Sequence, residues 1–157
     1  MGNISITLDQ AEIMLARTMA TFRSGLNRLN GTVNPKFKES DEYMNDLIGV
    51  CGEMVFAKQF NVYMDMSFQP RSGGHDFVMN SGKTVDIKTT EYDNGRLIVP
   101  KWKDDKRSDI YVLVTGQLPT FTIRGYALSD EVFTSVIDLG YGPCFGLQQD
   151  QLHDFRN

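Results

Sequence analysis

The sequence predicts an α/β (α+β) protein in one domain, in which a central sheet of about five strands is flanked by helices. Its 157 residues match the size of a single domain, and 41% of them are hydrophobic, enough for one buried core. Apolar residues recur with a helical spacing in the first third of the chain and with a strand spacing through the middle. The sequence has no internal repeat, linker or low-complexity tract, which favours one domain over residues 1–157.

Two long helices are predicted before the strands begin. In an N-terminal helical segment, 1–38, Thr7 is the expected N-cap of the first helix, and Asn30-Gly31 is expected to end it before a loop over 30–38. A second helix is predicted from about Asp41 to Phe60, capped by Ser40 or Asp41. The first helix is expected to bury one apolar stripe, made of Leu8, Ala11, Leu15, Met19, Phe22, Leu26 and Leu29.

The strands are predicted from alternating apolar residues between turn signals. After a turn at Arg71–Gly74, the segments 77–79 and 84–88 are expected to form a hairpin around Asn80-Ser81-Gly82. Residues 109–115 are nearly all apolar, which is typical of a central strand. The remaining predicted elements are strands at 96–99, 120–128 and 144–147, a short helix over 129–136 and a helical turn at 149–155.

Charge and cysteine content limit the classes of function. The net charge of −4 argues against a broadly basic nucleic-acid-binding surface, although positive charge is concentrated between Lys101 and Arg107. Cys51 and Cys144 are interpreted as small buried apolar residues, because two cysteines cannot form a disulfide scaffold. This favours a reducing compartment, and the sequence shows no signal peptide and no apolar run long enough to span a membrane. A cytoplasmic location without a membrane partner is therefore expected.

The informative stretch of the sequence is the predicted hairpin. In the strand Val85–Lys88, Asp86 and Lys88 point to one side while Val85 and Ile87 point into the core. The hairpin would carry Asp76 toward Asp86, and two neighbouring carboxylates are unfavourable unless a cation lies between them. Oxygen ligands of this kind suit Mg²⁺ or Mn²⁺.

The second helix contributes a third carboxylate, Glu53. Its helical face also carries Gly49 and Ala57, small residues that would let the helix approach the sheet closely. A glycine costs about 1 kcal/mol in a helix interior, so Gly49 and Gly52 together indicate a packing requirement.

These four residues resemble the signature of the PD-(D/E)XK nuclease superfamily. Asp76 matches the first acid of its motif, Asp86 the second, Lys88 the lysine, and Glu53 the acid of the first core helix. The sequence is similar to that of small stand-alone nucleases, which are often phage-encoded, over roughly residues 45 to 128, and it departs from the motif where Phe77 and not proline flanks Asp76. The resemblance implies a restriction-endonuclease-like catalytic core at about 40–128 with a mixed sheet, an extra N-terminal helix, and short C-terminal elements over 129–157.

The resemblance implies divalent-metal-dependent hydrolysis of phosphodiester bonds, with DNA as the expected partner. Asp76, Asp86 and the Ile87 carbonyl would hold Mg²⁺ or Mn²⁺, and Glu53 would be a direct or water-mediated ligand. Lys88 would position the attacking water or stabilise the transition state. The expected substrate contacts are Thr89, Thr90, Tyr92, Lys101, Lys103, Lys106 and Arg107, and Trp102 or Tyr92 would stack on a base.

Other interpretations remain open at this point. Asp86 and Lys88 are also compatible with an ordinary ion pair on a half-exposed strand, and His75 with a structural role or a phosphate contact. The alternative function is a catalytically silent nuclease fold, serving as a nucleic-acid-binding or assembly module. The sequence does not choose among exonuclease, endonuclease and junction resolvase, and it allows a homo-oligomer, with the N-terminal helix as the candidate contact.

Overall fold

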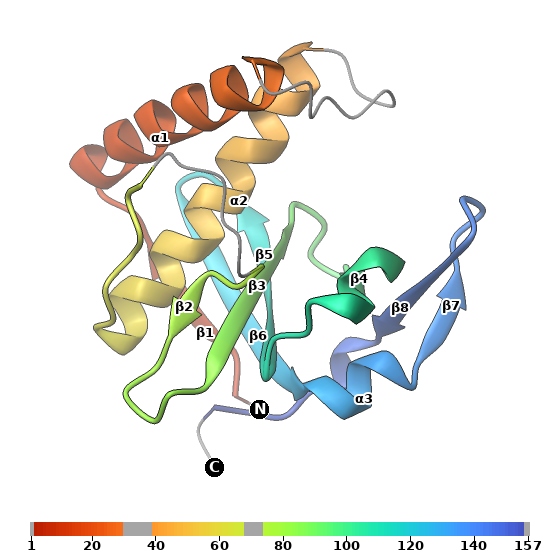
Figure 1. Ribbon diagram of the computed structural model, residues 1–157. Helices are drawn as coiled ribbons and strands as arrows, with labels where there is room; N and C mark the ends of the chain where they lie inside the picture. The colour runs from red at the N-terminus through yellow and green to blue at the C-terminus, as the bar shows by residue number, and fades with distance from the viewer. Residues whose placement is uncertain (1, 30–38, 68–73, 156–157) are drawn as a thin grey trace.

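The computed structural model describes residues 2–29, 39–67 and 74–155 of the chain. Three features predicted from the sequence lie outside these residues: the stop at Asn30-Gly31, the loop 30–38, and the Arg71–Gly73 part of the turn. The described elements form two sheets and two long helices, with short helices between them (Figure 1). This is the mixed α and β architecture that the sequence predicts.

Five strands form the larger sheet, in the spatial order β1-β6-β5-β3-β2. β3 and β5 run parallel, and the other neighbours are antiparallel, so the sheet is mixed as expected. The predicted central strand is the middle one, β5. The bounds are β1 Ile4–Thr7, β2 Phe77–Val78, β3 Thr84–Thr90, β5 Ile110–Gln117 and β6 Thr120–Leu128.

A second, three-stranded sheet has the order β4-β8-β7, with β4 Leu97–Val99, β7 Val136–Asp138 and β8 Pro143–Leu147. The strand predicted at 96–99 therefore belongs to this sheet, and the fifth place in the central sheet is taken by β1. The sequence prediction missed β1 because it is only four residues long and its Thr7 was interpreted as a helix cap. In the structure, the Ser5 and Thr7 hydroxyls instead pair with those of Thr122 and Thr120 on β6, each at 2.9 Å.

The first long helix, α1 (Gln10–Leu29), is capped by Asp9 and not by Thr7. Asp9 Oδ1 accepts a hydrogen bond from the Glu12 N–H, and Glu12 Oε2 accepts one from the Asp9 N–H, both at 2.8 Å. The predicted apolar stripe is also wrong at four of its seven positions, because Ala11, Leu15, Phe22 and Leu29 are exposed. The buried helical residues are Ala16, Met19, Ala20 and Ser24.

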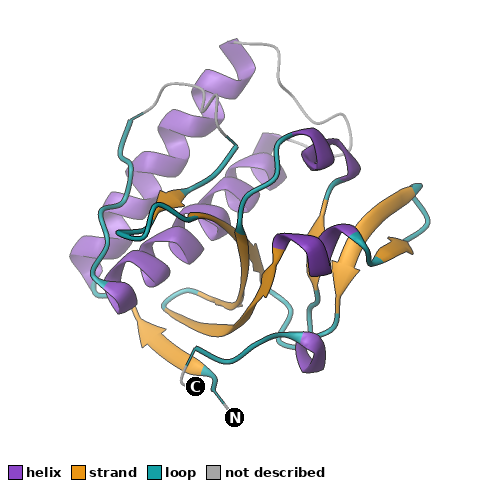
Figure 2. Ribbon diagram, turned by 60° about the horizontal axis from the view of Figure 1, so that its bottom comes forward, coloured by secondary structure: helices purple, strands orange, loops and turns teal. Residues whose placement is uncertain are grey.

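The second helix, α2 (Glu39–Phe60), lies between α1 and the five-stranded sheet (Figure 1). Its buried residues, such as Val50, Val55 and Phe56, share one core with Val85 and Ile87 of β3. A second core, with Tyr111 and Leu113 of β5 and Leu97 and Val99 of β4, joins the opposite face of the large sheet to the small sheet. The turned view shows the strands of the two sheets (Figure 2). The large sheet thus has helices on one face and the β4-β8-β7 sheet on the other.

Short helices complete the fold. The 3-10 helix η1 (Lys101–Asp105) follows β4, and a second one, η2 (Gln149–Gln151), follows β8. The predicted helix 129–136 is shorter in the structure, because α3 (Ser129–Phe133) ends before β7 begins at Val136. Among the described residues, no helix is both long and apolar enough to cross a bilayer.

The two cysteines differ in reactivity. Both are free thiols; Cys51 is fully buried in α2, whereas Cys144 is half-buried on β8. Burial raises the pKa of the Cys51 thiol to about 11, which leaves about one part in a thousand as thiolate at pH 8. We expect Ellman's reagent to modify Cys144 in the folded protein and Cys51 only after unfolding in guanidinium. Equal rates for Cys144→Ser and Cys51→Ser variants in buffer would contradict this assignment.

Candidate active site

Strand β3 presents Asp86 and Lys88 on one face, as its sequence predicts. Val85 and Ile87 are buried on the α2 side, and Asp86 is 2% exposed on the other. The Lys88 ammonium donates a hydrogen bond to Asp86 Oδ1 over 2.8 Å. A carboxylate so deeply buried requires a compensating charge, which Lys88 supplies from two residues away.

The hairpin brings Asp76 to the same strand. β2 pairs antiparallel with β3, and the Asp76 N–H donates to the Val85 carbonyl at 2.8 Å. The Asp76 side chain then accepts the Ile87 N–H through Oδ2, at 2.7 Å. The N–H and C=O of one strand residue face the same edge, so the Ile87 carbonyl lies on the Asp76 side of β3. The structure therefore places Asp76 beside the peptide that separates Asp86 from Lys88.

Glu53 reaches the site from α2 and is 7% exposed. Both of its oxygens accept hydrogen bonds from the Arg23 guanidinium, at 2.9 and 3.0 Å, in a bidentate pair. Sequence reasoning missed Arg23, which lies on α1. The spacing of residues on the buried face of α1 could have identified Arg23. It follows Met19 by four residues and precedes Ser24, and both of these residues are buried.

A second lysine, Lys103, contacts the other carboxylate oxygen of Asp86. It projects from η1, is 7% exposed, and places its ammonium 3.0 Å from Asp86 Oδ2. The same ammonium donates a hydrogen bond to the Gly74 carbonyl at 2.5 Å. Among the described residues, the buried Oδ2 atom has no hydrogen-bond partner, so the Lys103 contact compensates its charge without using its lone pairs.

These side chains line one cleft of about 470 Å³ between α2, the β2–β3 hairpin and η1. The four residues matching the nuclease signature, and Ile87, all border it. Its basic lining residues include Arg23, Lys88, Lys103 and Lys106, and His75 and Trp102 lie at its wall. The cleft thus combines carboxylates with cations, the composition expected where a metal ion and a phosphate meet.

A further acid in the cleft, Asp46, was not predicted. It lies on α2, two turns before Glu53, and burial raises its pKa above the usual value, opposed by the nearby Arg23 guanidinium. Gly49, between these two acids, opens onto the cleft: a Cβ at this position would meet nothing within 4 Å. The expectation that Gly49 lets the helix approach the sheet is therefore wrong.

Gly52 is the residue that brings α2 close to the sheet. A Cβ at Gly52 would lie 1.9 Å from the Thr89 hydroxyl oxygen, well inside contact distance. Thr89 therefore points toward α2, on the same face as Val85 and Ile87, and its buried Oγ1 has no hydrogen-bond partner among the described residues. The close approach of α2 to β3 at Gly52 therefore determines how far the next residue, Glu53, extends into the cleft.

Several residues predicted to contact substrate do not border this cleft. Arg107 is paired with Asp104 and stacks over the Phe133 ring at 4.3 Å. Thr90 accepts the Tyr92 N–H at 3.4 Å, while Tyr92 and Lys101 are exposed outside it. Lys103 and Lys106 do border the cleft. Trp102 is 63% exposed, so it does not pack into the core.

The donor chemistry of the site suits a hard divalent cation. Among the described residues, no three His, Cys, Asp or Glu side chains form a group arranged to hold a metal ion. Magnesium, however, commonly uses only one or two protein carboxylates, together with waters and substrate phosphates. Asp76, Asp86 and the Ile87 carbonyl satisfy that requirement, and the buried Asp86 Oδ2 retains free lone pairs.

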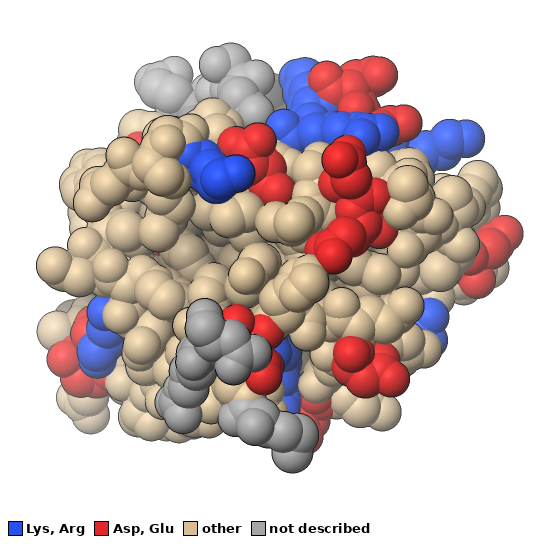
Figure 3. Space-filling model, turned by 90° about the horizontal axis from the view of Figure 1, so that it is seen from below, with Lys and Arg blue, Asp and Glu red and all other residues tan. Residues whose placement is uncertain are grey.

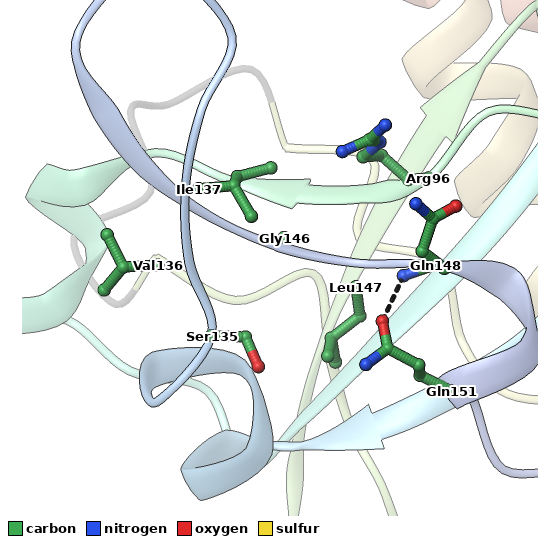
Figure 4. Close-up of a pocket in the computed structure, with 8 residues that line it drawn as sticks. All are labelled: Arg96, Ser135, Val136, Ile137, Gly146, Leu147, Gln148 and Gln151. Atoms are coloured by element: carbon green, nitrogen blue, oxygen red, sulfur yellow. Dashed lines mark hydrogen bonds between the residues drawn. The ribbon is translucent and has the colours of Figure 1, made fainter.

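Outside the cleft, charges of both signs are mixed, and a second hollow has a different lining. On the face shown in Figure 3, the Lys and Arg side chains of the described residues lie beside Asp and Glu side chains. A smaller pocket of about 260 Å³ lies between the small sheet and η2. Figure 4 shows it lined by Arg96 and the glutamines, with Gln151 turned back to accept the Gln148 N–H at 2.8 Å. The residues matching the nuclease signature do not border it.

The chain belongs to a family of unknown function, DUF5843, whose model matches residues 3–139. The matched region contains α1, α2, the β2–β3 hairpin and η1, and therefore every residue placed in the cleft. A search of the curated proteins finds none that matches the chain. The function therefore has to be argued from the geometry of the cleft.

Proposed function

We propose that this member of the family is a divalent-metal-dependent nuclease that hydrolyses phosphodiester bonds, with DNA as the expected substrate. One observation carries the proposal: Glu53, Asp76, Asp86 and Lys88 border one cleft. They come from α2, the residue before β2, and β3, which is the order of elements that the PD-(D/E)XK resemblance requires. The mixed sheet, with the long helix α2 against it, is compatible with a restriction-endonuclease-like core.

Within this proposal, Asp76, Asp86 and the Ile87 carbonyl would hold the metal. A bound Mg²⁺ or Mn²⁺ would lower the pKa of a water and neutralise charge on the phosphate. Lys88 keeps its ammonium at the cleft wall through Asp86, where it stabilises an anionic phosphorane-like transition state. Arg23 fixes both oxygens of Glu53, so that this carboxylate does not rotate freely in the cleft.

The proposal is tested by cleavage of labelled linear duplex, circular and single-stranded DNA in Mg²⁺, Mn²⁺ or EDTA. We expect cutting with either metal and none in EDTA. Asp86→Asn keeps the size of the side chain but removes the charge, so we expect it to lose both cutting and Mn²⁺ binding. Circular dichroism checks folding, because the variant leaves Lys103 buried opposite a neutral amide.

The substrates that are cut would choose among the nuclease types. Cutting of circular DNA requires an endonuclease, whereas cutting of linear DNA alone indicates an exonuclease. A folded protein that binds no metal and cuts none of these substrates would sink the proposal, and nucleic-acid binding without cutting would favour the silent binding module instead.

A further inference from the structure

The Lys103 ammonium lies against Asp86, one of the two acids of the proposed metal site. It lies 3.0 Å from Asp86 Oδ2 and also donates to the Gly74 carbonyl, two residues before Asp76. It therefore bridges the segment that carries Asp76 and the strand that carries Asp86. A metal ion bound to Asp86 Oδ2 would compete with this ammonium for the same oxygen.

The charges around Asp86 favour an exchange of cations. Lys88 alone is enough to neutralise Asp86, through its hydrogen bond to Oδ1. Lys103 is thus a second positive charge on one carboxylate, and its contact with Oδ2 does not use the oxygen's lone pairs. A divalent ion on Oδ2 would repel an ammonium this close strongly in a buried site.

The Lys103 ammonium has a second position available to it, over the neighbouring Trp102 ring. Lys103 extends from η1, a five-residue 3-10 helix at the cleft wall, whose neighbouring residue Trp102 is 63% exposed. Its ammonium already lies 5.1 Å from the centre of the Trp102 ring, an attractive contact for a cation. Lys88, by contrast, is a residue of β3 itself, and its position is fixed by the strand.

We infer that the Lys103 ammonium occupies the metal position on Asp86 in the metal-free protein and leaves it when a divalent ion binds. The inference rests on the proposed metal-dependent function. In the metal-free protein, Lys103 keeps the Asp76 and Asp86 segments at the correct separation. When the metal enters, the ammonium moves off Asp86 toward Trp102 and remains at the cleft wall.

The test is the affinity for Mn²⁺, measured by titration calorimetry on the full chain. Lys103→Gln removes the competing charge and keeps a polar side chain, so we expect it to bind Mn²⁺ about tenfold more tightly than the wild type. Lys106→Gln is the matched control, because Lys106 borders the same cleft but has no ion pair with Asp86 among those the structure describes. We expect its affinity to stay within about twofold of the wild type.

The results of the Mn²⁺ titrations distinguish a failure of the Lys103 displacement from a failure of the proposed metal-dependent function. Unchanged or weaker Mn²⁺ binding by a folded Lys103→Gln, beside a wild type that binds metal through Asp86, would overturn the displacement and leave the metal site standing. An equal increase in Mn²⁺ affinity in Lys106→Gln would show that the effect comes from net charge alone. That result would also overturn the displacement of Lys103. If neither the wild type nor Lys103→Gln binds Mn²⁺, the inference and the metal-dependent function fail together.

A second measurement needs no substitution. Trp102 is the only tryptophan of the chain, so its fluorescence reports on the surroundings of Lys103. We expect titration with Mg²⁺ to change the Trp102 emission of the wild type in a saturable way, and to change it much less in Lys103→Gln. Metal binding without any change in the wild-type emission would show that Lys103 stays in place.

Discussion

We expect Lys88→Met to lower the rate of the proposed metal-dependent DNA cleavage by at least about a hundredfold and to leave Mn²⁺ binding in place. The reason is that Lys88 is a charge beside the reacting phosphate and not a metal ligand, since its ammonium has no free lone pair. Methionine keeps much of the length and packing of the lysine chain but removes the charge. Single-turnover cleavage kinetics and Mn²⁺ titration on the same preparation measure the two effects separately.

Lys83→Met is the matched control for this substitution. Lys83 is exposed at the turn of the same hairpin and does not border the cleft. Removing it changes the net charge equally, and we expect a rate within about twofold of the wild type. A Lys88→Met protein that cuts at the wild-type rate would remove Lys88 from the mechanism, and one that no longer binds Mn²⁺ would give it a role in shaping the metal site.

Gly52→Ala destabilises the protein by about 1–3 kcal/mol, because the added methyl group overpacks the contact between α2 and β3. Its Cβ would lie 1.9 Å from Thr89 Oγ1 and 2.9 Å from Thr89 Cβ, so the helix must move away from the strand. The same movement withdraws Glu53 from the cleft, and cleavage falls together with stability. Urea unfolding gives the first effect and the cleavage assay the second.

Two companion variants sharpen this prediction. Gly49→Ala, one turn earlier, places its methyl group in open space, so the better helix propensity of alanine makes it neutral or stabilising by up to about 1 kcal/mol. Thr89→Ala removes the nearest clashing atom and recovers part of the loss in a double-mutant cycle. Equal free energies of unfolding for the Gly52→Ala and Gly49→Ala proteins would contradict a tight contact at Gly52.

The part of the site that the sequence predicts is the part that depends on local geometry. Asp86 and Lys88 share a face because strand side chains alternate, and Asp76 reaches them because the hairpin turn fixes the register. Neither argument needs knowledge of distant contacts. The central strand β5 followed in the same way, from an apolar run of the right length, whereas the mixed character of the sheet was implied by the family resemblance.

What the sequence did not predict depends on how separate elements pack. The large apolar residues of α1 suggested a stripe through Phe22, yet the helix buries Ala16, Met19 and Ala20. Small side chains let this face of α1 lie close against α2. Packing through this face turns Arg23 toward Glu53. The role of Lys103 was equally hidden, because only the position of η1 distinguishes it from the exposed lysines around it.

The order of strands in the large sheet has a consequence for synthesis on the ribosome. β3, which carries Asp86 and Lys88, takes its parallel partner from residues 110–117, and β1 at the start of the chain pairs with β6 at residues 120–128. Every cleft residue has therefore been translated before the strands that support it. A nascent chain therefore cannot assemble the cleft until residues up to about 128 have left the ribosome, and Asp86 and Lys88 of β3 remain without their supporting strands until then.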